Sequence, residues 1–95
     1  MYKLTLYCPV NRADTISSLL ETEDYTCHFA TGKWTDGEGE YRVEDVALLS
    51  FIVDDKETGE DLAREASKLL INAGESCVLY ELDPCNAVFT YAKRD

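Results

Sequence analysis

The sequence has few basic residues, no long apolar segment and only one histidine, and each shortage removes a class of function. Nine Lys and Arg stand against nineteen Asp and Glu, which gives a net charge of −10. So acidic a chain disfavours nucleic acids and anionic membranes as partners, and favours a cationic small molecule or a basic protein. No apolar run approaches membrane-spanning length, and residues 1–5 lack the apolar stretch of a signal peptide.

The sequence also offers few of the residues that metal-dependent or covalent catalysis requires. The four cysteines, at positions 8, 27, 77 and 85, show no CxxC spacing, and His28 has no second histidine to join it. We therefore predict no metal site, no cofactor and free thiols in a reducing cytoplasm. No serine lies on a Gly-x-Ser-x-Gly elbow, which argues against a serine nucleophile. His28 is expected to be a surface or interface side chain rather than a general base.

The apolar pattern predicts a single domain over residues 1–95. Strands are predicted where apolar residues alternate or run together: Tyr2–Cys8, Tyr25–Trp34, Val43–Val53 and Cys77–Tyr80. Helices are predicted at Asn11–Glu23, with Asn11 as the N-cap, and at Thr58–Ala73, with Asp61 at the capping-box position and Gly74 ending the helix. A polar loop, Thr35–Tyr41, joins the second and third strands.

This order of elements is typical of an α+β fold, a ferredoxin-like βαββαβ sandwich in which an antiparallel sheet carries both helices on one face. Glu81–Asn86 is predicted to be a turn leading to an extra C-terminal strand, Val88–Lys93. The third strand is apolar from Val46 to Val53 except for Ser50, which predicts burial on both faces. Since the helices cover only one face, we expect another subunit to cover the other.

Three groups of residues are candidates for ligand binding. Thr31-Gly32-Lys33-Trp34 ends the second strand with an aromatic ring that can stack on a base. Glu44-Asp45 opens the third strand across the polar loop, and Glu81 and Asp83 follow the fourth strand. An acidic pair beside aromatic surface can bind a cation or hold ribose hydroxyls. For each group taken alone, an ordinary solvated turn is the simpler interpretation.

Read together, these positions resemble the phage-encoded S-adenosylmethionine-degrading enzymes, an anti-restriction family of lyases. The resemblance spans residues 14 to 93 and rests on these segments: Ser76-Cys77-Val78-Leu79, Tyr91-Ala92-Lys93, Thr31-Gly32 with Trp34, Glu44-Asp45 ten residues after that aromatic, and Ala66–Asn72. It implies a homotrimer related to the nitrogen-regulatory PII fold, with active sites between subunits. Trp34 stands where a tyrosine is expected, so Tyr41 or Tyr7 would have to supply a hydroxyl.

The resemblance also implies the chemistry and the residues that perform it. S-adenosylmethionine is cleaved to 5′-methylthioadenosine and homoserine lactone by internal displacement, without a metal or a protein nucleophile. The residues implied as catalytic are Glu44, Asp45 and Tyr41, and those implied as substrate-binding are Trp34, Thr31, Gly32, Tyr7, Glu81 and Tyr91. Hydrolysis of S-adenosylmethionine in place of lactone formation stays open. A contact of Lys93 or His28 with the ligand stays open as well.

Two other functions remain open. One is a PII-like trimer that binds an adenine-containing ligand without turnover, since a fold does not fix a function. The other is an acidic DNA mimic that blocks a basic protein, which predicts carboxylates arrayed over one exposed face and no enclosed pocket.

Overall fold

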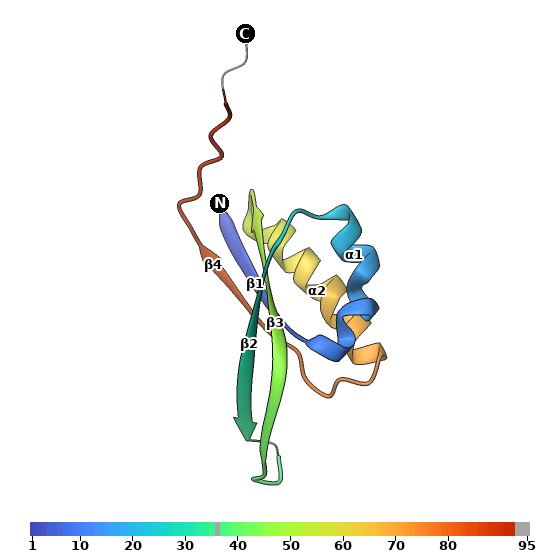
Figure 1. Ribbon diagram of the computed structural model, residues 1–95. Helices are drawn as coiled ribbons and strands as arrows, with labels where there is room; N and C mark the ends of the chain where they lie inside the picture. Colours follow the sequence, from blue (N-terminus) through green and yellow to red (C-terminus); the bar gives the residue numbers. More distant parts are fainter. Residues whose placement is uncertain (36, 93–95) are drawn as a thin grey trace.

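The computed structural model describes residues 1–35 and 37–92, and shows one antiparallel sheet with helices on one of its faces (Figure 1). The strands are β1 (Tyr2–Pro9), β2 (Thr26–Thr35), β3 (Tyr41–Val53) and β4 (Leu79–Pro84). The helical segments are a 3-10 helix η1 (Val10–Ile16), α1 (Ser17–Thr22) and α2 (Lys56–Asn72). The strand order is β2-β3-β1-β4. The predicted α+β class is confirmed, and the arrangement is compatible with a ferredoxin-like fold.

The core lies between the sheet and the helices. Buried residues alternate with more exposed ones along β1, and the buried ones point into this core. Leu4 and Leu6 are fully buried and Cys8 nearly so, and they lie opposite Phe51, Leu49 and Ala47 of β3. The helical segments supply the other side of this core with small and branched side chains: Ile16, Leu19, Leu62, Ala63, Ala66 and Leu70. Burial of this apolar layer is the main source of the domain's stability.

The opposite face of the sheet, called the outer face below, is only partly covered in the single chain. On β3, Leu48 and Ser50 are half-buried and Ile52 is 37% exposed, whereas their neighbours Leu49 and Phe51 are buried under the helices. From Ala47 to Ile52 the apolar run therefore shows the alternating burial of a strand covered on one face, whereas Val46, on the outer face, is buried as well. Cover of the outer face by a second subunit stays a prediction.

The first helical segment differs from the prediction. The chain passes from Pro9 directly into the 3-10 turns of η1, and only Ser17–Thr22 is α-helical. Asn11 lies inside η1 rather than before it, so its side chain is not at the position that caps a helix, and no side chain caps this N-terminus. Only Ile16 and Leu19 are fully buried in the two short helices, and so narrow an apolar stripe supports little regular helix.

The second helix begins two residues before the predicted start. Asp55 is the N-cap, and its carboxylate accepts a 2.7 Å hydrogen bond from the backbone N–H of Thr58. That bond is the largest cause of the lowered pKa of the Asp55 carboxyl, and a second bond from the Thr58 side chain acts the same way. Asp61 pairs with Arg64 on the helix surface instead of capping. Among the described residues, no helix combines the length and the apolar composition needed to cross a membrane.

The end of the chain contradicts the prediction most clearly. The segment read as a turn is mostly strand, because β4 covers Leu79–Pro84, and residues 85–92 belong to no helix or strand. Lys93, the last residue of the predicted extra strand, lies outside the described residues. Glu81 and Asp83 are compatible with a strand here because β4 is an edge strand with only Leu82 half-buried toward the core. The predicted extra C-terminal strand is absent from residues 85–92.

Gly59 in α2 gives a first testable prediction, because the helix packs very closely on the sheet there. A Cβ at this position would lie 2.6 Å from Leu82 Cδ1 and 3.3 Å from Val53 Cγ2. Gly59→Ala is therefore expected to destabilise the domain by ~1–3 kcal/mol, the usual cost of overpacking, although alanine is the better helix former. Chemical denaturation measures this change. Lys68→Ala, at an exposed position of the same helix, should change the stability little.

Candidate functional site

A cavity of about 690 Å³ lies where the outer face of the sheet meets the part of the β2–β3 hairpin that extends beyond β1. Its walls come from the end of β1, the two strands of the hairpin, and the segment between α2 and β4. Tyr7, Trp34, Glu44, Val46 and Leu79 line it with aromatic, acidic and aliphatic groups. The volume falls in the range of small-molecule sites, so this cavity is the candidate binding site.

Trp34 and Glu44 come together in the cavity because of the hairpin register. Gly32 pairs with Glu44 and Trp34 pairs with Arg42, so Trp34 and Glu44 are diagonal neighbours on one face of the hairpin. The indole Nε1 donates a 2.7 Å hydrogen bond to Glu44 Oε1. This bond fixes the ring and the carboxylate relative to each other. The carboxylate keeps further acceptor sites for a ligand.

Gly32 allows the indole to lie flat along the strand. A Cβ at this position would lie 2.4 Å from Cζ2 and 2.8 Å from Cη2 of the Trp34 ring. No side chain fits between the ring and the backbone here. A glycine two residues before the tryptophan is therefore a geometric requirement of the observed ring position.

Tyr7 and Glu81 form a second pair on the same face. Tyr7 lies opposite Leu79 and Thr5 lies opposite Glu81, which places the phenol diagonally across from the carboxylate. The Tyr7 hydroxyl donates a hydrogen bond to Glu81 Oε1. This bond raises the pKa of the phenol above its ordinary value, and desolvation and the carboxylate's charge act in the same direction. Tyr7 therefore presents a neutral phenol to the cavity.

Three other implied residues lie on the opposite face of the hairpin. Thr31 pairs with Asp45 in the register and donates a 3.4 Å hydrogen bond to Asp45 Oδ1. Tyr41 is 70% exposed, with Lys33 Nζ 4.2 Å from the centre of its ring. Because successive strand residues point to opposite faces, these side chains point away from Trp34 and Glu44. In a single chain, the structure does not bring Asp45 and Tyr41 together with Glu44.

Tyr91 is also remote from the cavity. It is 84% exposed on the segment that leaves the far end of β4, whereas the cavity lies near the start of that strand (Figure 1). A contact between Tyr91 and a ligand in this cavity therefore requires a different copy of the chain.

Sequence reasoning missed the wall contributed by Glu75, Ser76 and Cys77. This segment begins at Gly74, whose φ of 115° turns the chain out of α2, and Glu75 is held by an ion pair with Arg12, with Nε and Oε1 3.2 Å apart. The signal available in the sequence was Gly74, because a glycine just after a helix predicts a turn. It does not predict the direction that the chain takes after the turn.

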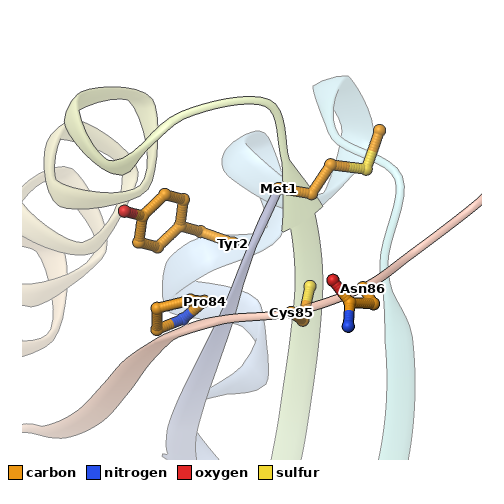
Figure 2. Close-up of a pocket in the computed structure, with 5 residues that line it drawn as sticks. All are labelled: Met1, Tyr2, Pro84, Cys85 and Asn86. Atoms are coloured by element: carbon orange, nitrogen blue, oxygen red, sulfur yellow. The ribbon is translucent and has the colours of Figure 1, made fainter.

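A second hollow, of about 430 Å³, lies at the other end of the sheet between the first residues of β1 and the end of β4. It is lined by Met1, Tyr2, Pro84, Cys85 and Asn86. Figure 2 shows that their side chains point in different directions and do not converge on a common centre. The cavity at Trp34 is the better candidate for a binding site.

The thiols and the histidine are distributed over β1, β2 and the two ends of β4. Within residues 1–35 and 37–92, no group of three or more His, Cys, Asp or Glu side chains is placed to hold a metal ion. His28 is exposed on β2 opposite Leu48 of β3, and all four cysteines are free. The pKa of the Cys8 thiol is raised to about 11, mainly by burial and to a smaller extent by the charge of Glu75 and by Cys27.

Thiol labelling tests this difference in environment. At pH 8 a water-soluble disulfide reagent should modify the exposed Cys77 quickly and leave Cys8 unmodified, since Cys8 is both buried and protonated there. Unfolding the protein in guanidinium should make Cys8 react as well. Peptide mass spectrometry identifies the labelled positions. Rapid labelling of Cys8 in the folded protein would mean that β1 is not packed as described.

No family model and no curated protein matches this chain. Two solved structures share its fold. A DUF3240 family protein from Shewanella baltica OS155 aligns with a TM-score of 0.57 and 15% identity over 96% of each chain. A Bacillus cereus protein related to NIF3 aligns with a TM-score of 0.54 and 16% identity over 90% of this chain, which spans 25% of the length of that protein. At these identities the likeness shows the fold alone.

Proposed function

We propose that this protein is an S-adenosylmethionine lyase that works as a PII-like homotrimer in the cytoplasm of a phage-infected host. The observation that carries the proposal is the hydrogen bond between the Trp34 indole and the Glu44 carboxylate in the wall of the 690 Å³ cavity. An aromatic face attracts a cation without a full opposing charge, and a fixed carboxylate accepts hydrogen bonds from hydroxyl or ammonium groups. S-adenosylmethionine carries groups of all these kinds.

The reaction suits a site without a metal or a nucleophile. The substrate's own carboxylate oxygen attacks its γ-carbon, a C–O bond forms, and the C–S bond breaks with its electron pair left on sulfur. The products are homoserine lactone and neutral 5′-methylthioadenosine, and no proton moves. The protein has to fold the methionine arm into the attack geometry and remove water from the opposed charges.

The role of Glu44 follows from the change in charge during this step. The sulfonium loses its charge in the transition state, so a carboxylate held against the sulfur would stabilise the substrate more than the transition state. Glu44 is therefore assigned to the ribose hydroxyls or the α-ammonium group. Trp34 is assigned to the adenine and the sulfonium, with the neutral Tyr7 phenol beside them.

The trimer supplies what the single chain lacks. The cavity opens to solvent through exposed residues such as Thr35, Cys77 and Leu79, whereas internal displacement requires the removal of water. A second copy on the half-covered outer face would close it. Because each copy carries a charge of −10, association works against repulsion and should tighten as salt is added.

The open cavity also favours one alternative, a trimer that binds an adenine-containing ligand without turnover. A third candidate, the acidic DNA mimic, has less support, because exposed carboxylates lie on α2, the hairpin and β4 and not on one face. Incubation of the purified protein with S-adenosylmethionine separates the three. The lyase forms methylthioadenosine in the presence of a chelator, the binding trimer only retains the ligand, and the mimic does neither.

A further inference from the structure

The end of the described chain is an apolar strand-like segment with no place in the sheet. This segment, Cys85–Ala92, is called the C-terminal tail below. Val88 is 85% exposed, Phe89 58% and Tyr91 84%. Together with Pro84 the tail forms nine successive residues without a charge, in a chain where 29% of the residues are charged. Such composition is typical of a strand that pairs with a neighbour.

The tail does not return to its own sheet. The backbone N–H of Cys85 donates a 2.9 Å hydrogen bond to the Met1 carbonyl, so the chain continues in the direction of β4 and leaves the sheet beyond it (Figure 1). The other edge, β2, lies three strand spacings away, about 14 Å across the sheet. Crossing that distance uses about four of the eight residues of the tail, which leaves too few to pair.

The two edges of the sheet differ in how they are protected. Edge strands usually carry charges that prevent pairing with other chains. The β4 edge has Glu81 and Asp83, whereas β2 has no charged residue from Thr26 to Gly32 when His28 is neutral. Phe29 on this edge is 77% exposed. In the part of the chain that the structure describes, β2 is therefore the edge open to an added strand.

We propose that the C-terminal tail of one copy adds as a further strand to the β2 edge of a second copy, along Thr26–Gly32. Backbone hydrogen bonds would give the affinity, and the apolar side chains of the tail would cover the exposed edge. The contact is uncharged on both sides, so it lets copies of net charge −10 meet. A head-to-tail contact of this kind closes into a ring when the rotation allows it, and three copies make the proposed trimer.

The exchange also bears on the candidate site, and in this respect it rests on the proposed function. Thr31 and Gly32 lie at the end of the docking edge nearest Trp34. When the tail runs parallel to β2, its C-terminal residue Tyr91 reaches the Gly32 end of that edge in a second copy, whereas in its own copy Tyr91 lies far from the cavity. The partner copy thereby supplies an aromatic residue that a single chain cannot bring to the site.

Two sets of variants of the full chain test the exchange by sedimentation equilibrium. Phe29→Lys places a charge on the β2 edge. The double variant Phe89→Pro and Thr90→Pro removes two successive N–H groups, one of which must face the pairing edge. Each change should weaken self-association at least ~10-fold, since several intermolecular hydrogen bonds are lost. The control, Ile71→Lys, replaces a 53% exposed apolar residue of α2 and should leave association unchanged.

Circular dichroism verifies that each variant remains folded, which is expected because all the changed side chains are exposed. A wild-type protein that is monomeric at micromolar concentration overturns the exchange and the trimer together. A trimer that tolerates both sets of changes overturns the exchange and leaves the lyase proposal standing. A trimer that is weakened by both sets, but that leaves S-adenosylmethionine intact, overturns the lyase and supports the exchange.

Discussion

Replacement of Glu44 with Gln is expected to lower the turnover of S-adenosylmethionine at least ~10²-fold, the loss typical of a key positioning or electrostatic contact. The glutamine side chain has nearly the same shape, and its carbonyl can still accept the hydrogen bond from Trp34 Nε1. The change therefore removes the negative charge and leaves the hairpin in place. Initial rates measured by chromatography of methylthioadenosine give the effect, with sedimentation as the check on assembly.

Asp45→Asn is the matched control for this substitution. Asp45 is the next residue along β3, and its carboxylate accepts from Thr31 on the opposite face of the hairpin. Asp45→Asn should therefore lower the rate of turnover much less than Glu44→Gln does. If Asp45 proves the sensitive position and Glu44 the tolerant one, the site lies on the other face, with Thr31 and Tyr41. If neither matters, the acidic pair is an ordinary solvated strand end.

Gly32→Ala is expected to weaken ligand binding by about 10-fold or more, because it displaces the Trp34 ring that is assigned to the adenine. The new Cβ would lie 2.4 Å from the Trp34 ring, so the indole has to leave its position and its bond to Glu44. Stacking of a base on an aromatic side chain is worth ~1–3 kcal/mol, which sets the size of the loss. Isothermal titration with S-adenosylmethionine or methylthioadenosine measures it.

The single tryptophan gives an independent readout of the same change. Trp34 is the only source of indole fluorescence in this chain, so Gly32→Ala should shift its emission in the absence of any ligand. Gly37→Ala is the control, because a Cβ there would have no atom within 4 Å and the backbone φ is not positive. Unchanged emission in Gly32→Ala would show that the ring does not rest on Gly32. A shifted emission with unchanged affinity would remove Trp34 from the binding site.

The sequence predicted the elements whose residues are buried on one side. The alternation of Leu4, Leu6 and Cys8 located β1, and the apolar spacing in Thr58–Ala73 located most of α2. It failed where burial does not decide the structure. β4 is an edge strand with one half-buried residue in the core, Leu82, and the tail has strand-forming residues without a neighbouring strand in its own copy. An apolar pattern cannot distinguish pairing within a chain from pairing between chains.

The candidate site depends on register, which the sequence did not determine. Trp34, Glu44 and Tyr7 were each identified from the sequence, and the structure brings all three to one cavity. The pairing of Gly32 with Glu44 decides that Glu44, and not Asp45, shares a face with Trp34, and a shift of one residue would exchange their roles. Turn geometry sets that register in a hairpin, and the polar loop allows more than one turn.

Cleavage of S-adenosylmethionine in water enriched in oxygen-18, with a chelator present, tests the central claim most directly. Internal displacement places an oxygen of the substrate's own carboxylate on the γ-carbon, so mass spectrometry should find methylthioadenosine together with an unlabelled γ-oxygen in homoserine lactone. Later opening of the lactone by water at its acyl carbon leaves that oxygen unlabelled. A labelled γ-oxygen would contradict internal displacement, and the absence of methylthioadenosine would contradict the lyase function itself.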